Sequence, residues 1–293
     1  MRTQRIAWTL LLLAIAAAPV ARADPPPRGL SPAVCGWPRA GELVAVVVHG
    51  IHPVHEDLDP LAADLAERGF RVLRFVYDDK ADLDRSAEAL ARDLEGLVRA
   101  ARPSEVAVVA HSMGGLVSRR ALSADLGLGA LPVRFRLLTV ATPFGGFASA
   151  NWSRFDLGLG PKVFHTLGSR ARFIRRPGAL APNATHVKVE TDERDLRRRG
   201  ERDDKVKLKS QVQEIVDAAA CARYRLRLGH VGSIRDEADR VPEPLRELLT
   251  RHLGPPRARL APGLAQDPRS ARGLAQTVQR QATALPREAA PRP

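Results

Sequence analysis

The sequence predicts an α/β fold with a doubly wound, mostly parallel sheet. Two observations carry this prediction: apolar runs rich in β-branched residues recur along the chain, and amphipathic segments of helical spacing separate them. A continuous apolar run suits a strand covered on both faces, and strands that alternate with helices form parallel sheets. Ligands of such sheets bind at the carboxyl ends of the strands, so we expect a functional site in the loops that follow them.

The N-terminal part of the sheet is predicted from two strands and two helices. The run Leu-Val-Ala-Val-Val-Val at 43–48 is the first strand. Residues 57–68 carry leucines at helical spacing, and 71–77 form the second strand. A second amphipathic helix over 85–101 stops before Pro103, because proline cannot continue a helix.

The C-terminal part of the sheet follows the same alternation. A strand at 105–109 leads directly into a tight turn and a helix that begins near Gly115. The strand at 134–140 ends in Ala-Thr-Pro-Phe-Gly-Gly. The remaining elements are a strand, a helix, a last strand and a closing helix, at 185–190, 212–222, 224–228 and 244–253.

The start of the chain predicts export. Arg2 and Arg5 precede an apolar stretch over 6–20, and the small residues of Ala21-Arg22-Ala23 close it. We therefore predict a signal peptide over 1–23, cut after Ala23, which places the protein in the periplasm or outside the cell. A retained anchor is the alternative, but the stretch is short for spanning a bilayer.

The 293 residues suffice for one sizeable α/β domain, predicted at 42–253 after a Pro- and Gly-rich lead-in at 24–41. Residues 147–184 interrupt the alternation with aromatic residues, Gly and Pro. Long connections are commonly functional, so we expect this segment to form a partial cap, with plain surface packing as the alternative. Residues 254–293 have few large apolar side chains and are predicted to be a disordered tail.

The chain is strongly basic, with a formal charge of +13 and a pI near 10.9. Removal of the signal segment takes away three arginines and leaves +10. The charge is scattered and aromatic residues make up only 4% of the chain, which argues against a nucleic-acid partner. We expect a weak attraction to anionic envelope surfaces instead. The sequence does not indicate an oligomeric state.

The cysteines are expected to form one disulfide. An exported chain with an even number of cysteines is a disulfide candidate, so Cys35 pairs with Cys221 in this prediction, and two unpaired thiols are the alternative. Neither cysteine has metal-type spacing, and His52 and His55 have no matching third ligand. No metal site is predicted.

The motif that carries the most chemistry is Ala-His-Ser-Met-Gly-Gly at 110–115. A turn between a strand and a helix lifts the hydroxyl of Ser112 clear of the sheet edge. The small residues Ala110 and Gly114 keep Cβ atoms out of the place where strand and helix approach each other. We therefore predict that Ser112 is a nucleophile, with a chance match of a short pattern as the alternative.

A serine nucleophile needs a base and an acid that orients the base. His230 directly follows the last predicted strand, where a loop would hold its imidazole over the carboxyl edge of the sheet. His252 lies comparably late in the chain but inside a helix. We predict that His230 is the base, and a histidine with only a structural role is the alternative.

The acid is expected in the charged segment after the strand at 185–190. Asp203 is the preferred residue. Asp204, Asp192 and Asp195 are alternatives, and the last two lie nearer the end of the strand. An acid in this loop can reach the imidazole nitrogen that faces away from the serine.

Two backbone amides are predicted to stabilise an oxyanion. One belongs to Met113, the residue after the nucleophile. The other belongs to Ile51, in the loop after the first strand, where Gly50 lets the backbone approach a ligand. His49 is expected to brace that loop.

Together these motifs resemble the α/β-hydrolase superfamily, and most of all its small secreted bacterial lipases and esterases. The resemblance spans about 41–253 and rests on Val-Val-Val-His-Gly-Ile (46–51), the serine motif, and Gly-His-Val-Gly (229–232). The stretch Asp203-Asp-Lys-Val, with Ser210 beyond it, is similar to the Asp-Gly-x-Val stretch of such lipases, but Asp204 replaces the glycine. Ala-Thr-Pro-Phe-Gly-Gly (141–146) also resembles a strand end of these lipases.

The resemblance implies an α/β-hydrolase fold, no organic cofactor, and hydrolysis of a carboxylic ester through an acyl-enzyme. The apolar residues of 147–184 favour an acyl or lipid ester. An acyltransferase or thioesterase would use the same residues, and a catalytically silent binding protein is a third alternative. Because His230 must be neutral to accept a proton, activity is expected to fall below about pH 6 to 7.

Overall fold

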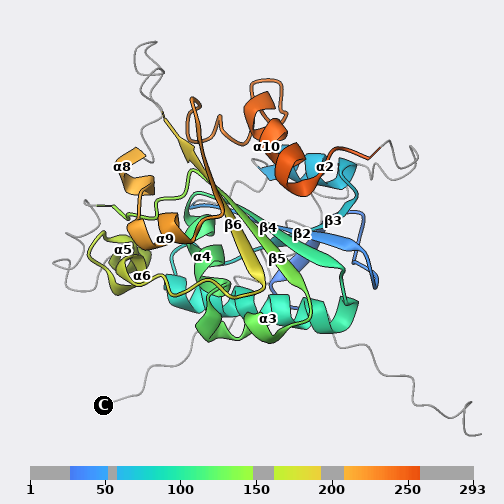
Figure 1. Cartoon of the computed structure of the whole chain (residues 1–293), viewed down its shortest axis with the longest axis horizontal. Helices are drawn as coiled ribbons and strands as arrows, with labels where there is room; N and C mark the ends of the chain where they lie inside the picture. The colour runs from blue at the N-terminus through green and yellow to red at the C-terminus, as the bar shows by residue number, and fades with distance from the viewer. Residues whose placement is uncertain (1–26, 52–57, 148–161, 193–207, 258–293) are drawn as a thin grey trace, which may run out of the picture. The chain divides into compact units, whose positions relative to one another are not determined.

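The protein is represented by a computed structural model that describes residues 27–51, 58–147, 162–192 and 208–257 (Figure 1). Within these ranges seven strands form one sheet in the order β1-β3-β2-β4-β5-β6-β7. All neighbouring strands are parallel except the edge strand β1, which is antiparallel to β3. The predicted doubly wound, mostly parallel sheet is therefore confirmed.

The predicted strands and helices are all present, and short elements are added between them. The N-terminal elements are β1 (Leu30–Val34), β2 (Leu43–Val48), α2 (Asp59–Glu67), β3 (Phe70–Phe75) and α3 (Leu83–Ala101). The central elements are β4 (Glu105–His111), α4 (Met113–Ala121), two 3-10 turns (Ala124–Leu126 and Leu128–Ala130) and β5 (Arg134–Val140). The C-terminal elements are α5 (Lys162–Leu167), α6 (Arg172–Arg175), β6 (Ala184–Thr191), α8 (Leu208–Gln211), α9 (Glu214–Ala219), β7 (Ala222–Leu226) and α10 (Glu243–Leu253).

The lead-in contains a strand that the sequence analysis did not predict. Proline cannot donate to a strand ladder and is tolerated at sheet edges and bulges. Pro32 occupies such a position, because β1 is the edge strand and its register with β3 shifts between Pro32 and Val34. The proline content of the lead-in therefore did not indicate an edge strand, although one forms there.

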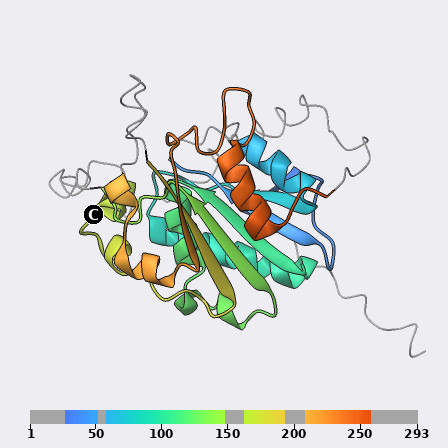
Figure 2. The same cartoon turned by 45° about the horizontal axis from the view of Figure 1, so that its top comes forward.

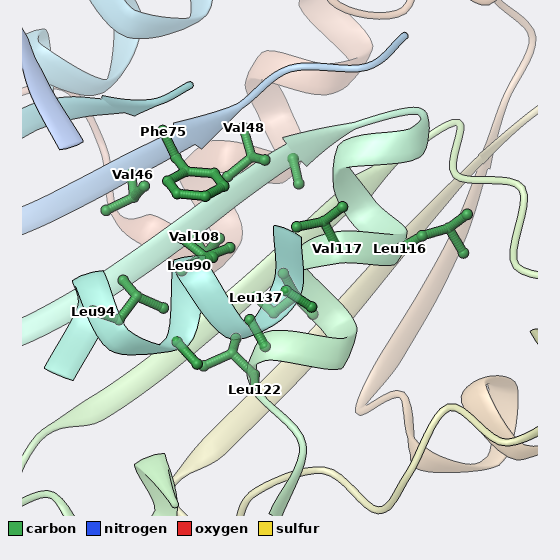
Figure 3. Packing of buried hydrophobic residues seen from close by; sticks show 14 of the residues in the cluster. Val46, Val48, Phe75, Leu90, Leu94, Val108, Leu116, Val117, Leu122 and Leu137 are labelled. Atoms are coloured by element: carbon green, nitrogen blue, oxygen red, sulfur yellow. The ribbon is translucent and has the colours of Figure 1, made fainter. Parts of the chain in front are cut away.

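Helices cover both faces of the sheet. Figures 1 and 2 show α3 and α4 on one face and α2 and α10 on the other. Side chains alternate along β2: Val46 packs in the core beneath α3 and α4, while Val47 packs in the core beneath α2 and α10. Leu90 and Leu94 of α3 fill the first core against the sheet, as Figure 3 shows. Burial on both faces explains why the central strands are continuous apolar runs.

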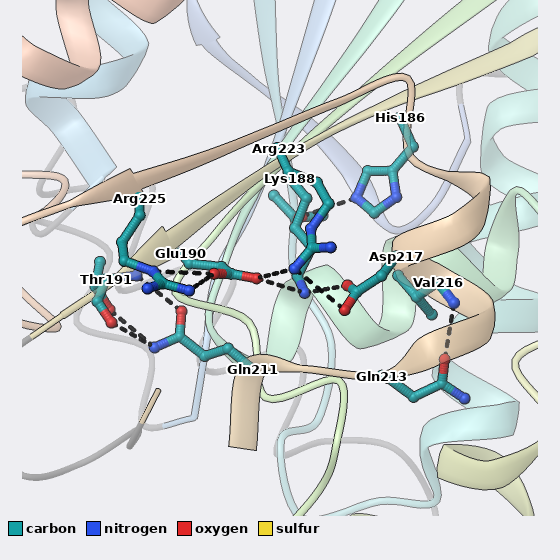
Figure 4. A network of polar contacts seen from close by, with 11 residues as sticks. His186, Lys188, Glu190, Thr191, Gln211, Gln213, Val216, Asp217, Arg223 and Arg225 are labelled. Atoms are coloured by element: carbon teal, nitrogen blue, oxygen red, sulfur yellow. Dashed lines mark hydrogen bonds and ion pairs between the residues drawn. The ribbon is translucent and has the colours of Figure 1, made fainter. Parts of the chain in front are cut away.

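Strand β6 buries polar side chains on one face. The ammonium group of Lys188 lies 3.0 Å from a Glu190 carboxylate oxygen and also pairs with Asp217 of α9. Arg223 of β7 contacts both acids, at 3.1 Å and 3.4 Å (Figure 4). Buried charges are tolerated when they are paired in this way. Charge pairing therefore takes the place of apolar packing between β6, β7 and α9.

Several predicted segments lie wholly or partly outside the described residues. These are the signal peptide (1–23), residues 148–161 of the predicted cap, and most of the predicted tail (254–293). In the described part of the cap segment, Phe173 and Ile174 of α6 are buried in the core beneath α3 and α4. None of the helices in the described ranges has the length and apolar character needed to span a bilayer.

The predicted disulfide is wrong. Cys35 directly follows β1 and Cys221 directly precedes β7, and these strands are the two opposite edges of the sheet. A disulfide needs Cα atoms within about 7 Å, whereas each strand-to-strand step is about 4.8 Å. Both cysteines are accordingly free thiols. The pairing was predicted only because an exported chain has an even number of cysteines. The order of the strands places the two residues at opposite edges of the sheet.

Candidate active site

Ser112 lies at the junction of β4 and α4, at the carboxyl edge of the sheet. Its backbone has φ 53° and ψ −129°, a conformation that side chains other than glycine rarely adopt. The turn is held by the Ser112 amide, which donates to the Val140 carbonyl at 2.9 Å, and by the Gly115 amide, which donates to the Ser112 carbonyl at 3.0 Å. Strained backbone of this kind persists where surrounding contacts determine it and is concentrated at functional sites.

Two glycines make this turn possible. A Cβ atom on Gly114 would lie 2.3 Å from the carbonyl oxygen of His49. A Cβ atom on Gly115 would lie 1.9 Å from the hydroxyl oxygen of Thr142. The first obstacle is backbone and cannot move aside, so α4 approaches the end of β2 only because residue 114 has no side chain.

The loop after β2 lies against the Ser112 side chain. A Cβ atom on Gly50 would lie 2.9 Å from Ser112 Cβ and 3.3 Å from its hydroxyl oxygen. Ile51, the predicted second oxyanion donor, follows immediately and is partly exposed, while Met113 is buried at the start of α4. The structure thus brings together the two segments whose amides were predicted to face an oxyanion.

His49 contacts both its own loop and Tyr77. The Tyr77 hydroxyl donates to the His49 carbonyl at 2.9 Å, and the two rings stack at 4.4 Å. His49 Nδ1 lies 2.7 Å from the Gly50 carbonyl oxygen. Burial, with a contribution from Asp79, raises the pKa of Tyr77 far above its ordinary value, so the hydroxyl stays protonated and remains a donor. Sequence analysis did not single out Tyr77, because a tyrosine at a strand end is an ordinary core residue.

His230 lies in the loop after β7, beside the residue that precedes Ser112. The rings of His111 and His230 are 4.5 Å apart. His111 Nε2 lies 2.9 Å from the His230 carbonyl oxygen, and the Ser233 hydroxyl donates to the same oxygen at 2.7 Å. Since a carbonyl only accepts, the His111 Nε2 carries the proton in this bond. His111 and Ser233 are site residues that the sequence analysis missed, because only the folded chain brings β4 and this loop together.

One of the four predicted acids lies in the described residues. Asp192 directly follows β6, its side chain is buried, and its amide donates to the Leu226 carbonyl at 2.8 Å. Leu226 ends β7, four residues before His230, so Asp192 lies at the base of the histidine loop. Asp195, Asp203 and Asp204 lie outside the described residues.

The segment that carries these acids is closed at its base. Gln211 of α8 binds Thr191, the last residue of β6, through both ends of its amide. Its oxygen accepts from the Thr191 amide and its nitrogen donates to the Thr191 carbonyl, each at 2.9 Å. The Gly145 amide donates to the Ser210 carbonyl at 2.7 Å and joins this base to the strand end after β5. Within the described ranges, no three side chains gather in a way that could hold a metal ion.

Part of the chain matches the model of a known protein family. The model of a family described as "Putative serine esterase (DUF676)" matches residues 40–170, which include β2, the Ser112 turn and α4. No curated protein matches the chain.

Among solved structures, the chain is similar to the lipase BlEst2 of Bacillus licheniformis in its mature form, with 18% identity over 72% of this chain and 90% of that chain and a TM-score of 0.48. The propeptide form of the same lipase shares 18% identity over 69% and 49% of the two chains, with a TM-score of 0.49. The esterase Pf2001 of Pyrococcus furiosus shares 16% identity over 72% and 81%, with a TM-score of 0.46.

The sheet order, the strand–turn–helix at Ser112 and the family match agree with one another. The strand order is that of a doubly wound sheet, the serine occupies its carboxyl edge, and the description of the matched family names a serine as its reactive group. The chain therefore combines a doubly wound α/β sheet with a segment, residues 40–170, that matches a family described as putative serine esterases.

Proposed function

We propose that the protein cleaves carboxylic esters with Ser112 as nucleophile, His230 as base and an acid from the segment after β6. The observation that carries this proposal is the conformation of Ser112, a serine with positive φ between a buried strand and a helix. The contact between the rings of His230 and His111 supports it, because His111 is the residue directly before the nucleophile.

The reaction follows from these roles. His230 removes the Ser112 proton as the hydroxyl oxygen attacks the ester carbonyl. The amides of Ile51 and Met113 stabilise the negative charge on the carbonyl oxygen, which exists only in the tetrahedral state. His230 then protonates the leaving alcohol, and water attacks the acyl-enzyme with His230 again as base. The close packing of Gly50 against Ser112 supports the assignment of Ile51.

Two acids are proposed as alternatives for the third role. Asp203 is favoured by its similarity to the acid stretch of lipases, and Asp192 by its buried position at the base of the histidine loop. In either case the carboxylate holds the imidazole in the orientation and tautomer that accept the serine proton.

The proposed substrate is an ester with an apolar acyl chain, and the proposed location is the periplasm or the medium. Partly exposed Ile51 beside the Ser112 loop and the apolar residues of 147–184 support an acyl substrate. Two arginines followed by an apolar stretch, before the small residues that end at Ala23, support export. The net positive charge of the chain supports a weak attraction to anionic envelope surfaces.

The test is hydrolysis of p-nitrophenyl esters of increasing acyl length. Ser112→Ala is expected to lower kcat/KM by at least about 1,000-fold, because the nucleophile is lost, whereas Ser104→Ala, at an exposed serine, leaves it unchanged. Of Asp192→Asn and Asp203→Asn, only the variant at the true acid should lose activity on a comparable scale. Full activity in Ser112→Ala would refute the proposal, and an added alcohol that captures most of the acyl group would show an acyltransferase.

A further inference from the structure

Arg119 of α4 is a buried cation, and its surroundings differ from those of the other buried cation in this region. The Arg119 residue is 1% exposed. Its Nη2 donates to the Gly178 carbonyl at 3.0 Å, while Nε and Nη1 have no hydrogen-bond partner. Burial lowers the pKa of Arg119 to about 10, so the guanidinium is still charged at neutral pH.

The comparison with Lys188 shows what Arg119 lacks. Lys188 is buried to the same degree and is compensated by Glu190 and Asp217. No carboxylate in the described ranges pairs with Arg119, and the charge that adds to the lowering of its pKa belongs to another cation, Arg120. An uncompensated buried charge destabilises the folded protein, as the loss of one partner from a buried ion pair does.

Other polar groups without partners lie in the same interior region, between α4 and strands β5 and β6. His186 of β6 is 0% exposed, and its Nδ1 has no hydrogen-bond partner, while its Nε2 lies 2.9 Å from the Thr139 hydroxyl of β5. The Thr142 hydroxyl also has no partner and lies against α4 at Gly115, one helical turn from Arg119.

His186 faces the core that α4 covers, because its ring packs edge-on against Phe144 of that core with 5.6 Å between the ring centroids. Burial lowers the pKa of His186 to about 3, and the positive charges of Arg119 and Lys188 add to this effect. His186 is therefore neutral near pH 7. When the Thr139 hydroxyl donates to Nε2, the imidazole proton resides on Nδ1, so His186 presents a donor in the same region as the free guanidinium N–H groups.

We propose that this region is a binding site for a small monovalent anion such as chloride, held by Arg119 and His186. A chloride ion accepts hydrogen bonds from the N–H groups that are without partners. Its negative charge also compensates the positive charge of Arg119, which a water molecule cannot do. The polar atoms are closed to bulk solvent, which favours a monatomic ion over the larger and strongly hydrated sulfate or phosphate. The anion stabilises the packing of α4, the helix that begins beside Ser112, against β5 and β6.

The first test is the thermal stability of the full-length protein at pH 7 and constant ionic strength, with chloride exchanged for gluconate. Wild type should gain about 3 to 5 °C in Tm as chloride rises to saturation, because the ligand binds only the folded state. Arg119→Met should abolish this gain. Arg176→Gln removes an exposed arginine and should retain it, which separates a specific site from general screening of a basic surface.

The second test does not depend on a variant that folds. Crystals grown or soaked in sodium bromide should give an anomalous peak in contact with Arg119 Nε and Nη1. A Tm that is equal in chloride and gluconate, together with no anomalous peak, would show that water fills the region and would overturn the proposal. A bromide peak without any chloride dependence of Tm would mean an adventitious ion only and would overturn it as well. Ester hydrolysis by Ser112 is measured independently of both outcomes.

Discussion

Strands β4 and β6 share one parallel sheet but bury opposite chemistry. β4 is apolar on both faces, with Val106 and Val108 in one core and Ala107 and Val109 in the other. β6 has Val187 and Val189 on one face and a row of polar residues, from His186 to Glu190, on the other. The two strands are therefore held in place in different ways. Apolar packing holds β4, which leads to Ser112, and ion pairs hold β6, which leads to the segment expected to carry the acid.

The polar face of β6 is held by charges that compensate one another. Burial alone would raise the pKa of Glu190, but hydrogen bonds and ion pairs with Lys188, Arg223 and Arg225 outweigh it and lower the pKa (Figure 4). Glu190 therefore remains ionised in the folded protein. Apolar packing tolerates similar replacements, whereas a paired charge depends on each partner.

Among the polar residues of β6 and β7, the largest effect is expected for Lys188→Met. The change leaves Glu190 and Asp217 buried without their shared ammonium partner. We expect the free energy of unfolding to fall by about 3 kcal/mol, near the lower end for a broken buried pair, because Arg223 and Arg225 still contact Glu190. Urea unfolding measures this change.

Leu90→Ala in the apolar core is the matched comparison for that variant. It is expected to cost about 2 to 5 kcal/mol with no dependence on salt, because a cavity and not a charge is created. A loss below about 1 kcal/mol for Lys188→Met would show that the ion pairs do not hold β6, β7 and α9 together.

A smaller effect is expected from the pH dependence due to His186. Its pKa is about 3 in the folded protein and ordinary, near 6.5, when unfolded. The unfolded state therefore binds more protons between these values, and stability is lost as pH falls below 6.5. We expect a loss of about 1.6 kcal/mol between pH 6.5 and pH 5, because the slope rises from half of its limit at pH 6.5 towards about 1.4 kcal/mol per unit of pH. His186→Leu should remove this part of the slope in urea unfolding at both pH values in chloride-free buffer, and an unchanged slope would contradict it.

The smallest effect is expected for Arg225→Ala at the rim of the polar region. The Arg225 side chain is 49% exposed, and its ion pair with Glu190 at 3.2 Å is screened by solvent. Such pairs contribute about 0 to 1 kcal/mol, and the change in urea midpoint should fall in that range. A loss as large as that of Lys188→Met would place the stabilising charge at the surface and not at the buried ammonium.

The difference between the two strands also explains what the sequence could predict. The apolar runs of β2, β4 and β5 indicate buried strands, and the Ser112 turn could be predicted because a strand precedes it and a helix follows it. The buried ion pairs of β6 could not be predicted, because Thr-His-Val-Lys-Val-Glu has the alternation of a half-exposed strand and its partner Asp217 is distant in the chain.

The same limit applies to the residues around His230. His111 has no distinguishing pattern, and the Asp192 position gains meaning only when its amide binds the end of β7. β1 was missed for a related reason, since the effect of Pro32 depends on which side of the strand has a neighbour. Features that depend on neighbouring residues in the sequence could be predicted. Contacts between residues that only the order of the strands brings together could not.

The most direct test of the role of Ser112 is covalent labelling with a fluorophosphonate, followed by mass spectrometry of the intact protein and its peptides. An activated serine attacks the phosphorus and releases fluoride, so wild type should gain one adduct, on the peptide that contains Ser112. Ser112→Ala should gain none, and His230→Ala should react far more slowly because the base is missing. An adduct on another residue, or labelling of Ser112→Ala at the rate of wild type, would contradict the assignment of Ser112 as the nucleophile.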